Sequence, residues 1–149
     1  MSKTPTPAGS QRLRPGPLTR PSGTGCPAYS ETLPRVGESA VVARRLVGQA
    51  LGVWHRDALA DAARLVVTEL VANAVEHAEG ANIRVTITRL DDGGVHVGVA
   101  DKSGSRPERR VAQPDDVGGR GLALVDHMAT AWGSDPLPDG KRVWAVVSA

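Results

Sequence analysis

Hydrophobic and polar residues follow two different periods along the chain, and the first of them is helical. In residues 37–52, apolar side chains recur every three or four positions, which predicts an amphipathic helix. Gly37 or Ser39 can cap its start, and Gly52 can end it. The core face expected for this helix consists of Val41, Ala43, Leu46, Val47 and Ala50.

A second and longer helical pattern covers residues 57–78. Asp57 can serve as its N-cap, and Gly80 follows its expected end. At about 100° per residue, the apolar positions of this segment fall on one arc, which we expect to face the core. These positions are Leu59, Ala63, Val66, Leu70 and Ala74.

The period then shortens to two residues. Residues 83–87 and 95–99 alternate apolar with polar or small side chains on either side of a turn at 91–94, which predicts a β-hairpin with one apolar face. Asp101 stands where the second strand ends. Residues 29–33 are expected to form a short edge strand that stops at Pro34.

The last third of the chain reads as a loop, a helix and two strands. Residues 102–118 are rich in proline, glycine and charge, which predicts a loop. Gly119-Arg120-Gly121 then leads into a helix over residues 122–132, with Leu122, Val125 and Met128 on one side. The remaining expected elements are a strand near 130–133, a turn over 134–140 and a strand over 141–148.

Together these elements predict an α/β (α+β) fold, a two-layer sandwich of a mixed, mostly antiparallel sheet covered by about three helices. The length of 149 residues fits one domain. We place it at residues 29–149, after a disordered tail at 1–28 that is rich in proline and glycine. Residues 1–30 carry a net charge of +4 and the remainder −2, so the basic character belongs to the tail.

Several function classes are excluded by composition. No apolar run is long enough to span a bilayer, and the N-terminal residues lack the apolar centre of a secretory signal, so we expect a cytoplasmic protein without membrane contact. The single cysteine, Cys26, leaves no internal disulfide and no cysteine-rich zinc site. Four cations spread over the tail do not predict direct nucleic-acid binding. The sequence also lacks GxxxxGK[ST], HExxH and GxSxG motifs.

Three groups of residues carry candidate chemistry. Glu69, Asn73 and His77 lie along one flank of the second helix, at the edge of its apolar arc. They form either a hydrogen-bonded boundary row or a site in which Asn73 offers oxygen to Mg²⁺ and Glu69 accepts a proton. Asp101 is either a turn residue or an acceptor for an exocyclic amine, which selects adenine over guanine.

The third group is the glycine-rich segment before the third predicted helix, Gly118-Gly119-Arg120-Gly121. Glycines let backbone amides approach an anion, and a helix N-terminus favours negative charge. Arg120 can add a charge-assisted contact. The same segment can also be a simple turn.

The order of these pieces is more specific than any one of them. Along the chain there follow ELVANAVEHA on a helix, a hairpin, VADKSG, a loop, GGRGLALV and a final strand. This order resembles the adenosine-phosphate-binding (Bergerat-type) fold of gyrase, heat-shock chaperones, sensor histidine kinases and mismatch-repair ATPases. Within that superfamily, the chain most resembles the anti-sigma-factor serine/threonine kinases, especially small actinobacterial ATP-binding regulators. The resemblance covers about residues 30–149.

This resemblance implies a role for each candidate residue. Asn73 matches the magnesium-binding asparagine, Glu69 the acid proposed to activate a substrate serine, and Asp101 the adenine-binding aspartate. His77 matches a basic position near the phosphates, or it is a packing histidine. The full set implied at the nucleotide is Asn73, His77, Asp101, Gly104, Gly119, Arg120, Gly121 and Leu122. The first glycine box departs from the family's DxGxG, because Ser103 and Ser105 replace both glycines.

The resemblance also implies a function. The expected activity is that of an ATP- and Mg²⁺-dependent protein serine/threonine kinase that acts as an anti-sigma factor. Its partners would be a sigma factor, a protein antagonist that it phosphorylates, or both, and members of this family often form homodimers. The alternative is a non-catalytic module in transcriptional or developmental signalling, in which bound ATP stabilises a partner-binding surface and no phosphate moves.

Overall fold

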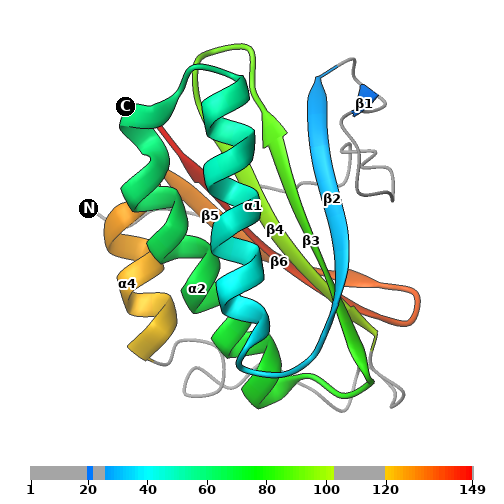
Figure 1. Ribbon diagram of the computed structural model, residues 1–149. Coiled ribbons are helices and arrows are strands. Elements are labelled where there is room, and N and C mark those ends of the chain that lie inside the picture. The colour runs from blue at the N-terminus through cyan, green and yellow to red at the C-terminus, as the bar shows by residue number, and fades with distance from the viewer. Residues whose placement is uncertain (1–19, 22–25, 103–119, 149) are drawn as a thin grey trace.

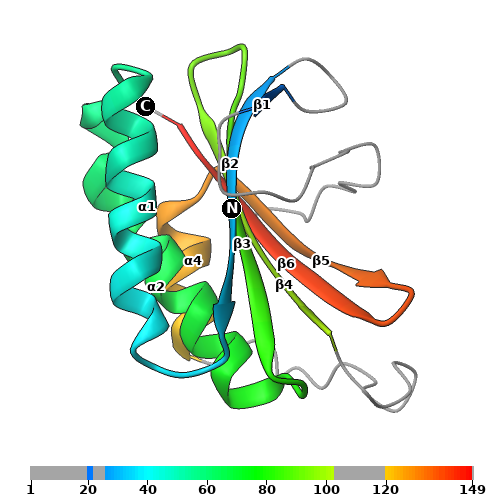
Figure 2. The same ribbon diagram turned by 45° about the vertical axis from the view of Figure 1, so that its right-hand side comes forward.

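The computed structural model describes residues 20–21, 26–102 and 120–148, with side chains for 26–101 and 122–148. Helices cover one face of an antiparallel sheet, so the molecule has two layers (Figures 1 and 2). This confirms the predicted two-layer α+β sandwich. One detail differs, because every strand pairing among the described residues is antiparallel and the sheet is not mixed. None of the described helices is long and apolar enough to cross a membrane.

The sheet has the strand order β1-β2-β3-β4-β6-β5. The predicted hairpin is confirmed: β3 and β4 pair around a turn in which Gly93 has φ +98°. The final strand, β6, pairs between β4 and β5. The bounds are β1 Arg20–Pro21, β2 Pro27–Pro34, β3 Asn82–Arg89, β4 Val95–Lys102, β5 Ala131–Leu137 and β6 Gly140–Val147.

Two strands differ from their predicted extent. Strand β2 is longer than expected and pairs with β3 along its length and with β1 at Pro27 and Ala28. Strand β5 runs on to Leu137, so the predicted turn over 134–140 is wrong, and the turn is confined to residues 138–139. Pro136 is compatible with β5 because β5 is the last strand in the described sheet, where only the N–H groups that face β6 take part in the ladder.

The helices are α1 Ser39–Val53, α2 Ala60–His77 and α4 Arg120–Met128, with a short 3₁₀ helix, η1, at Asp57–Leu59 before α2. The predicted N-caps are wrong, and α1 runs one residue past Gly52, its predicted end. The Ser39 hydroxyl donates to the Pro34 carbonyl oxygen at 2.6 Å, so it ties α1 to β2 and does not cap the helix. Asp57 begins η1 and makes no capping hydrogen bond. Helix α2 ends at His77, and Gly80, with φ +97°, follows that end as predicted.

The third helix is shorter than predicted. It stops at Met128. Two residues later the Thr130 N–H donates to the Val146 carbonyl oxygen of β6 at 2.8 Å, so the backbone has already left the helix and joined the sheet. Trp132, expected in the helix, is instead in β5, where its Nε1–H donates to Asp126 of α4 at 2.8 Å. This bond ties α4 to the sheet. The predicted tail at 1–28 lies outside the described residues except for residues 20–21 and 26–28.

The core lies between α2 and the sheet. All five apolar positions predicted for α2 are buried, together with the hairpin residues that face them. For α1 the prediction holds at Ala43, Leu46, Val47 and Ala50 but is wrong at Val41, which is 48% exposed. Val41 precedes Ala43 by two residues, or about 200° of helix, so the two side chains point to opposite sides.

The other face of the sheet contains buried polar groups. His96 alternates with the core residues Val95 and Val97, so its side chain is on the side away from the helices. Its ring stacks on Trp144 at a centroid distance of 5.4 Å. Burial, and secondarily the Arg142 guanidinium, lower the pKa of His96 to about 4. His96 is therefore neutral in the folded protein at neutral pH.

This lowered pKa predicts a pH-dependent stability. The unfolded chain takes up a proton on His96 near pH 6.5, whereas the folded chain does so only near 4. The contribution of neutral, buried His96 to the free energy of unfolding is complete above pH 6.5, and it is lost as the pH drops toward 4. Between pH 7 and pH 5 we expect a loss of about 2 kcal/mol in the free energy of unfolding.

The measurement is urea unfolding at both pH values for the wild type, His96→Phe and His96→Gln. Both substitutions remove the titrating ring. The free energy of unfolding of each variant should therefore fall less between pH 7 and pH 5 than that of the wild type. Comparing slopes cancels the packing cost that each substitution adds at either pH. Equal slopes in all three proteins would contradict the assignment.

Candidate functional site

Helix α2 presents different flanks to its two neighbours. On one flank, the Thr68 hydroxyl oxygen accepts a hydrogen bond from Arg44 of α1 at 3.2 Å. Helix α2 lies between α1 and α4 (Figure 1), so the opposite flank is turned toward α4. Counting about 100° per residue from the buried arc, Glu69 and Asn73 fall on the α4 side. The predicted row is therefore on the flank away from α1.

The side chains of this row are half-buried. Within the described part of the chain, Glu69 and Asn73 form no side-chain hydrogen bond or ion pair. The described residues thus supply none of the partners that a hydrogen-bonded boundary row requires. His77 is 26% exposed, and its Nε2 lies 3.7 Å from the exposed carboxylate of Glu76. This loose contact fits either of the roles expected for His77.

Asp101 lies inside β4, opposite Ile83 of β3 and Lys141 of β6. Its side chain falls on the same face as Val97 and Val99, which is the face covered by the helices. It is 5% exposed, and it is the one buried acidic side chain among the residues whose burial is described. Because Asp101 is paired on both sides within the sheet, it is not a turn residue, and its role as an acceptor for an exocyclic amine stays a prediction.

The glycine-rich segment is described only from Arg120 onward. Arg120 and Gly121 form the first residues of α4, and Leu122 is buried with its side chain in the core. The first N–H groups of a helix have no intrahelical acceptor, so this end can bind an anion. Gly104, Gly119 and the replaced glycine positions Ser103 and Ser105 lie outside the described residues.

The three predicted segments lie toward the same end of the molecule (Figures 1 and 2). The C-terminal end of α2, the C-terminal end of β4 and the first residues of α4 all lie at the lower end in Figure 1, and the turned view in Figure 2 agrees. This end of the molecule thus carries a buried carboxylate, a half-buried helix flank and a helix N-terminus, and their joint binding of a nucleotide stays a prediction. The described residues contain no cluster of three His, Cys, Asp or Glu side chains that could hold a metal ion.

Asp101 also borders a hollow of about 290 Å³ at the ends of β3 and β4. Arg84 and Ala100, which point away from the helices, form part of its wall, together with Asp139. None of the three row residues of α2 borders it. This hollow therefore shares Asp101 with the candidate site but does not extend to the α2 row.

One positioning residue was missed by the sequence reasoning. Arg35, in the connection between β2 and α1, donates from Nη1 to the Val75 carbonyl oxygen at 2.7 Å and from Nε to the Gly80 carbonyl oxygen at 2.6 Å. Its N–H donates to the Ala81 carbonyl oxygen at 2.9 Å. The first bond satisfies a carbonyl in the last turn of α2, and the other two fix the connection after it, so together they hold the end that bears His77. A single arginine in a connection has no periodicity, so no sequence signal marks it.

Comparison with known proteins identifies the family of the domain. A search of curated proteins finds no significant match. A family model described as the histidine kinase-like ATPase domain matches residues 33–147, which includes the α2 flank, the end of β4 and the start of α4. This match supports ATP binding by the domain and is compatible with ATP hydrolysis or phosphotransfer. The chain belongs to the histidine kinase-like ATPase domain family.

Proposed function

We propose that the protein is an anti-sigma factor with ATP-dependent serine/threonine kinase activity, which phosphorylates a protein antagonist of the anti-sigma factor. The observation that carries the proposal is the flank of α2 toward α4, where Glu69 and Asn73 are half-buried, one turn apart and without partners among the described residues. A proton acceptor and a neutral oxygen at adjacent turns suit phosphoryl transfer to a hydroxyl group.

Binding and orientation of the nucleotide would come from two groups. The buried carboxylate of Asp101 would accept a hydrogen bond from the exocyclic amine of adenine, at a position where guanine presents an acceptor. The amide oxygen of Asn73 is a ligand type that Mg²⁺ accepts. When bound, Mg²⁺ supplies positive charge that offsets the negative charge on the phosphate oxygens.

Glu69 would serve the transfer step. The substrate's serine or threonine oxygen forms a bond to the γ-phosphorus, the bond from that phosphorus to the β-phosphate oxygen breaks, and ADP leaves. The Glu69 carboxylate takes the hydroxyl proton. The phosphate adds negative charge to the antagonist at a packed interface, which expels the antagonist and leaves the protein able to hold a sigma factor.

A second candidate function is a non-catalytic module in which bound ATP stabilises the partner-binding surface. Ser103 and Ser105 favour it, because serine disfavours the positive φ angles that glycine permits in the first box. An assay with labelled ATP and candidate antagonists separates the two functions, since only a kinase transfers label to protein.

Asn73→Ala removes the amide oxygen proposed to meet Mg²⁺ and leaves a good helix former in α2. We expect magnesium-dependent ATP binding to be lost while the melting temperature stays near that of the wild type. Isothermal titration calorimetry with and without Mg²⁺ measures this directly. Unchanged affinity with Mg²⁺ present would exclude Asn73 from the site.

Asp101→Asn replaces one acceptor oxygen by a donor that would face the adenine amine. We expect the preference for ADP over GDP to fall by about tenfold or more, because a buried polar group is left unpaired. Competition binding with both nucleotides gives the ratio, and circular dichroism reports whether the variant is folded. A folded variant with the wild-type ratio would remove Asp101 from the adenine site.

Glu69→Gln distinguishes the kinase from the module. The amide keeps the size of the side chain and cannot accept the proton, so ATP affinity should persist while phosphoryl transfer falls by about 10²–10⁴-fold. Single-turnover transfer to the antagonist, with ATP affinity measured on the same sample, provides both quantities. Transfer at the wild-type rate would be inconsistent with Glu69 as the base.

A further inference from the structure

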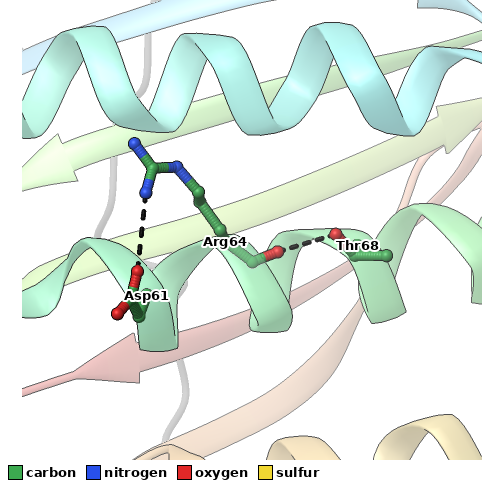
Figure 3. Close-up of polar contacts among 3 residues, drawn as sticks. All are labelled: Asp61, Arg64 and Thr68. Atoms are coloured by element: carbon green, nitrogen blue, oxygen red, sulfur yellow. Dashed lines mark hydrogen bonds and ion pairs between the residues drawn. The ribbon is translucent and has the colours of Figure 1, made fainter.

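A basic pocket lies between α1 and α2 on the flank away from α4. It has a volume of about 390 Å³ and is lined by Arg44, Arg45, Gly48, Gln49 and Arg64. Figure 3 shows the Arg64 side chain extending from α2 into the space beside α1. We refer to these five residues as the arginine pocket.

The positive charge of the arginine pocket is only partly offset. Arg44 donates to the neutral Thr68 hydroxyl, which itself donates to the Arg64 carbonyl oxygen at 2.7 Å. Arg64 lies 3.6 Å from Asp61, whose side chain is fully exposed, and such pairs are weak in water. Arg45 forms no hydrogen bond or ion pair with the described residues. Three guanidinium groups therefore meet one exposed carboxylate.

Gly48 gives the Arg64 guanidinium its position. A Cβ atom at Gly48 would lie 2.7 Å from Nη2 of Arg64, closer than side-chain atoms normally approach. Glycine inside a helix is less favourable than alanine. In this structure the glycine lets the guanidinium lie against the backbone of α1. The Arg64 head group is thus placed beside those of α1.

Two exposed aliphatic side chains are neighbours of the arginines along α1 and α2. Val41 is one helical turn before Arg45 on α1 and is 48% exposed. Leu65 follows Arg64 on α2 and is 45% exposed. A small inorganic anion would use the arginines alone. A protein segment that carries carboxylates and aliphatic side chains would use both kinds of group.

We propose that the arginine pocket docks an acidic, aliphatic segment of the protein partner. Carboxylates of that segment pair with Arg44, Arg45 and Arg64, and its aliphatic side chains cover Val41 and Leu65. The inference rests on the partner-binding part of the proposed function and needs no phosphoryl transfer. The pocket and the candidate nucleotide site lie on opposite flanks of α2, so partner and nucleotide can bind together.

The test uses the full chain and a fluorescein-labelled peptide of glutamate and leucine, with fluorescence anisotropy as the readout. We expect Arg45→Glu and Arg64→Glu each to weaken peptide binding by about threefold to tenfold, with a larger loss in the double variant. Arg89→Glu makes the same charge change at the end of β3 and should alter affinity by less than about twofold. An equal loss of peptide affinity in Arg89→Glu would mean that the net charge of the protein, and not the arginine pocket, determines binding, and it would overturn the proposal.

Gly48→Ala tests the geometry without changing any charge. The new methyl group displaces the Arg64 guanidinium, so peptide affinity should fall by about threefold or more. The melting temperature should stay level or rise, because alanine favours the helix. Wild-type peptide affinity in a folded Gly48→Ala protein would overturn the placement of Arg64 in the docking site.

Two other occupants are outcomes of the same experiment. If inorganic phosphate displaces the peptide at the same charge concentration, the pocket is a simple anion site and the proposal is wrong. If the peptide does not bind while the wild type self-associates and the Arg45→Glu, Arg64→Glu protein is monomeric, the occupant is a second copy. Asn73→Ala should still bind the peptide, so failure of the nucleotide site and failure of the arginine pocket are distinguishable.

Discussion

The arrangement of the molecule depends on burial of one face of α2 against the sheet. Val66, Leu70 and Ala74 lie in the same core as the apolar residues of β4 and β6. Burying each large aliphatic side chain contributes about 1.5–3 kcal/mol. Turning α2 by one residue would carry these side chains toward the margin of the core. The rotation of α2 about its axis is therefore set by packing.

Once the rotation of α2 is set, the directions in which its two flanks face are also set. The flank with Arg64 and Thr68 meets α1, and the flank with Glu69 and Asn73 is turned toward α4. One helix thus separates a basic surface from the surface at which we propose that the nucleotide binds. Arg35 fastens the end of α2 to the connection after β2, which keeps the site end of the helix in place.

Short-range periodicity predicted most of the fold and the site framework. The buried arc of α2, the β3–β4 hairpin and the position of Asp101 at the end of β4 all follow from spacing along the chain, because each depends on neighbours close in sequence. The resemblance then grouped Glu69, Asn73 and Asp101 into one site. Their roles stay predictions.

The features that were missed depend on contacts between distant segments. Ser39 donates to β2 and does not cap α1, and β5 extends past Pro136 because its outer side has no strand partner in the described sheet. The Arg35 contacts join residues about forty positions apart, and the arginine pocket needs both helices in place. Spacing within one segment holds no information on such pairs.

The most direct test of the account is amide NMR of the folded protein titrated with ADP and Mg²⁺. If α2 divides the molecule as described, the largest shift changes fall at Glu69, Asn73, Asp101 and Leu122, and the amides of Arg44, Arg45 and Gly48 change little. Shift changes concentrated at α1, or around Arg84 and Asp139 on the other side of the hollow that Asp101 borders, would contradict the placement of the nucleotide between α2 and α4.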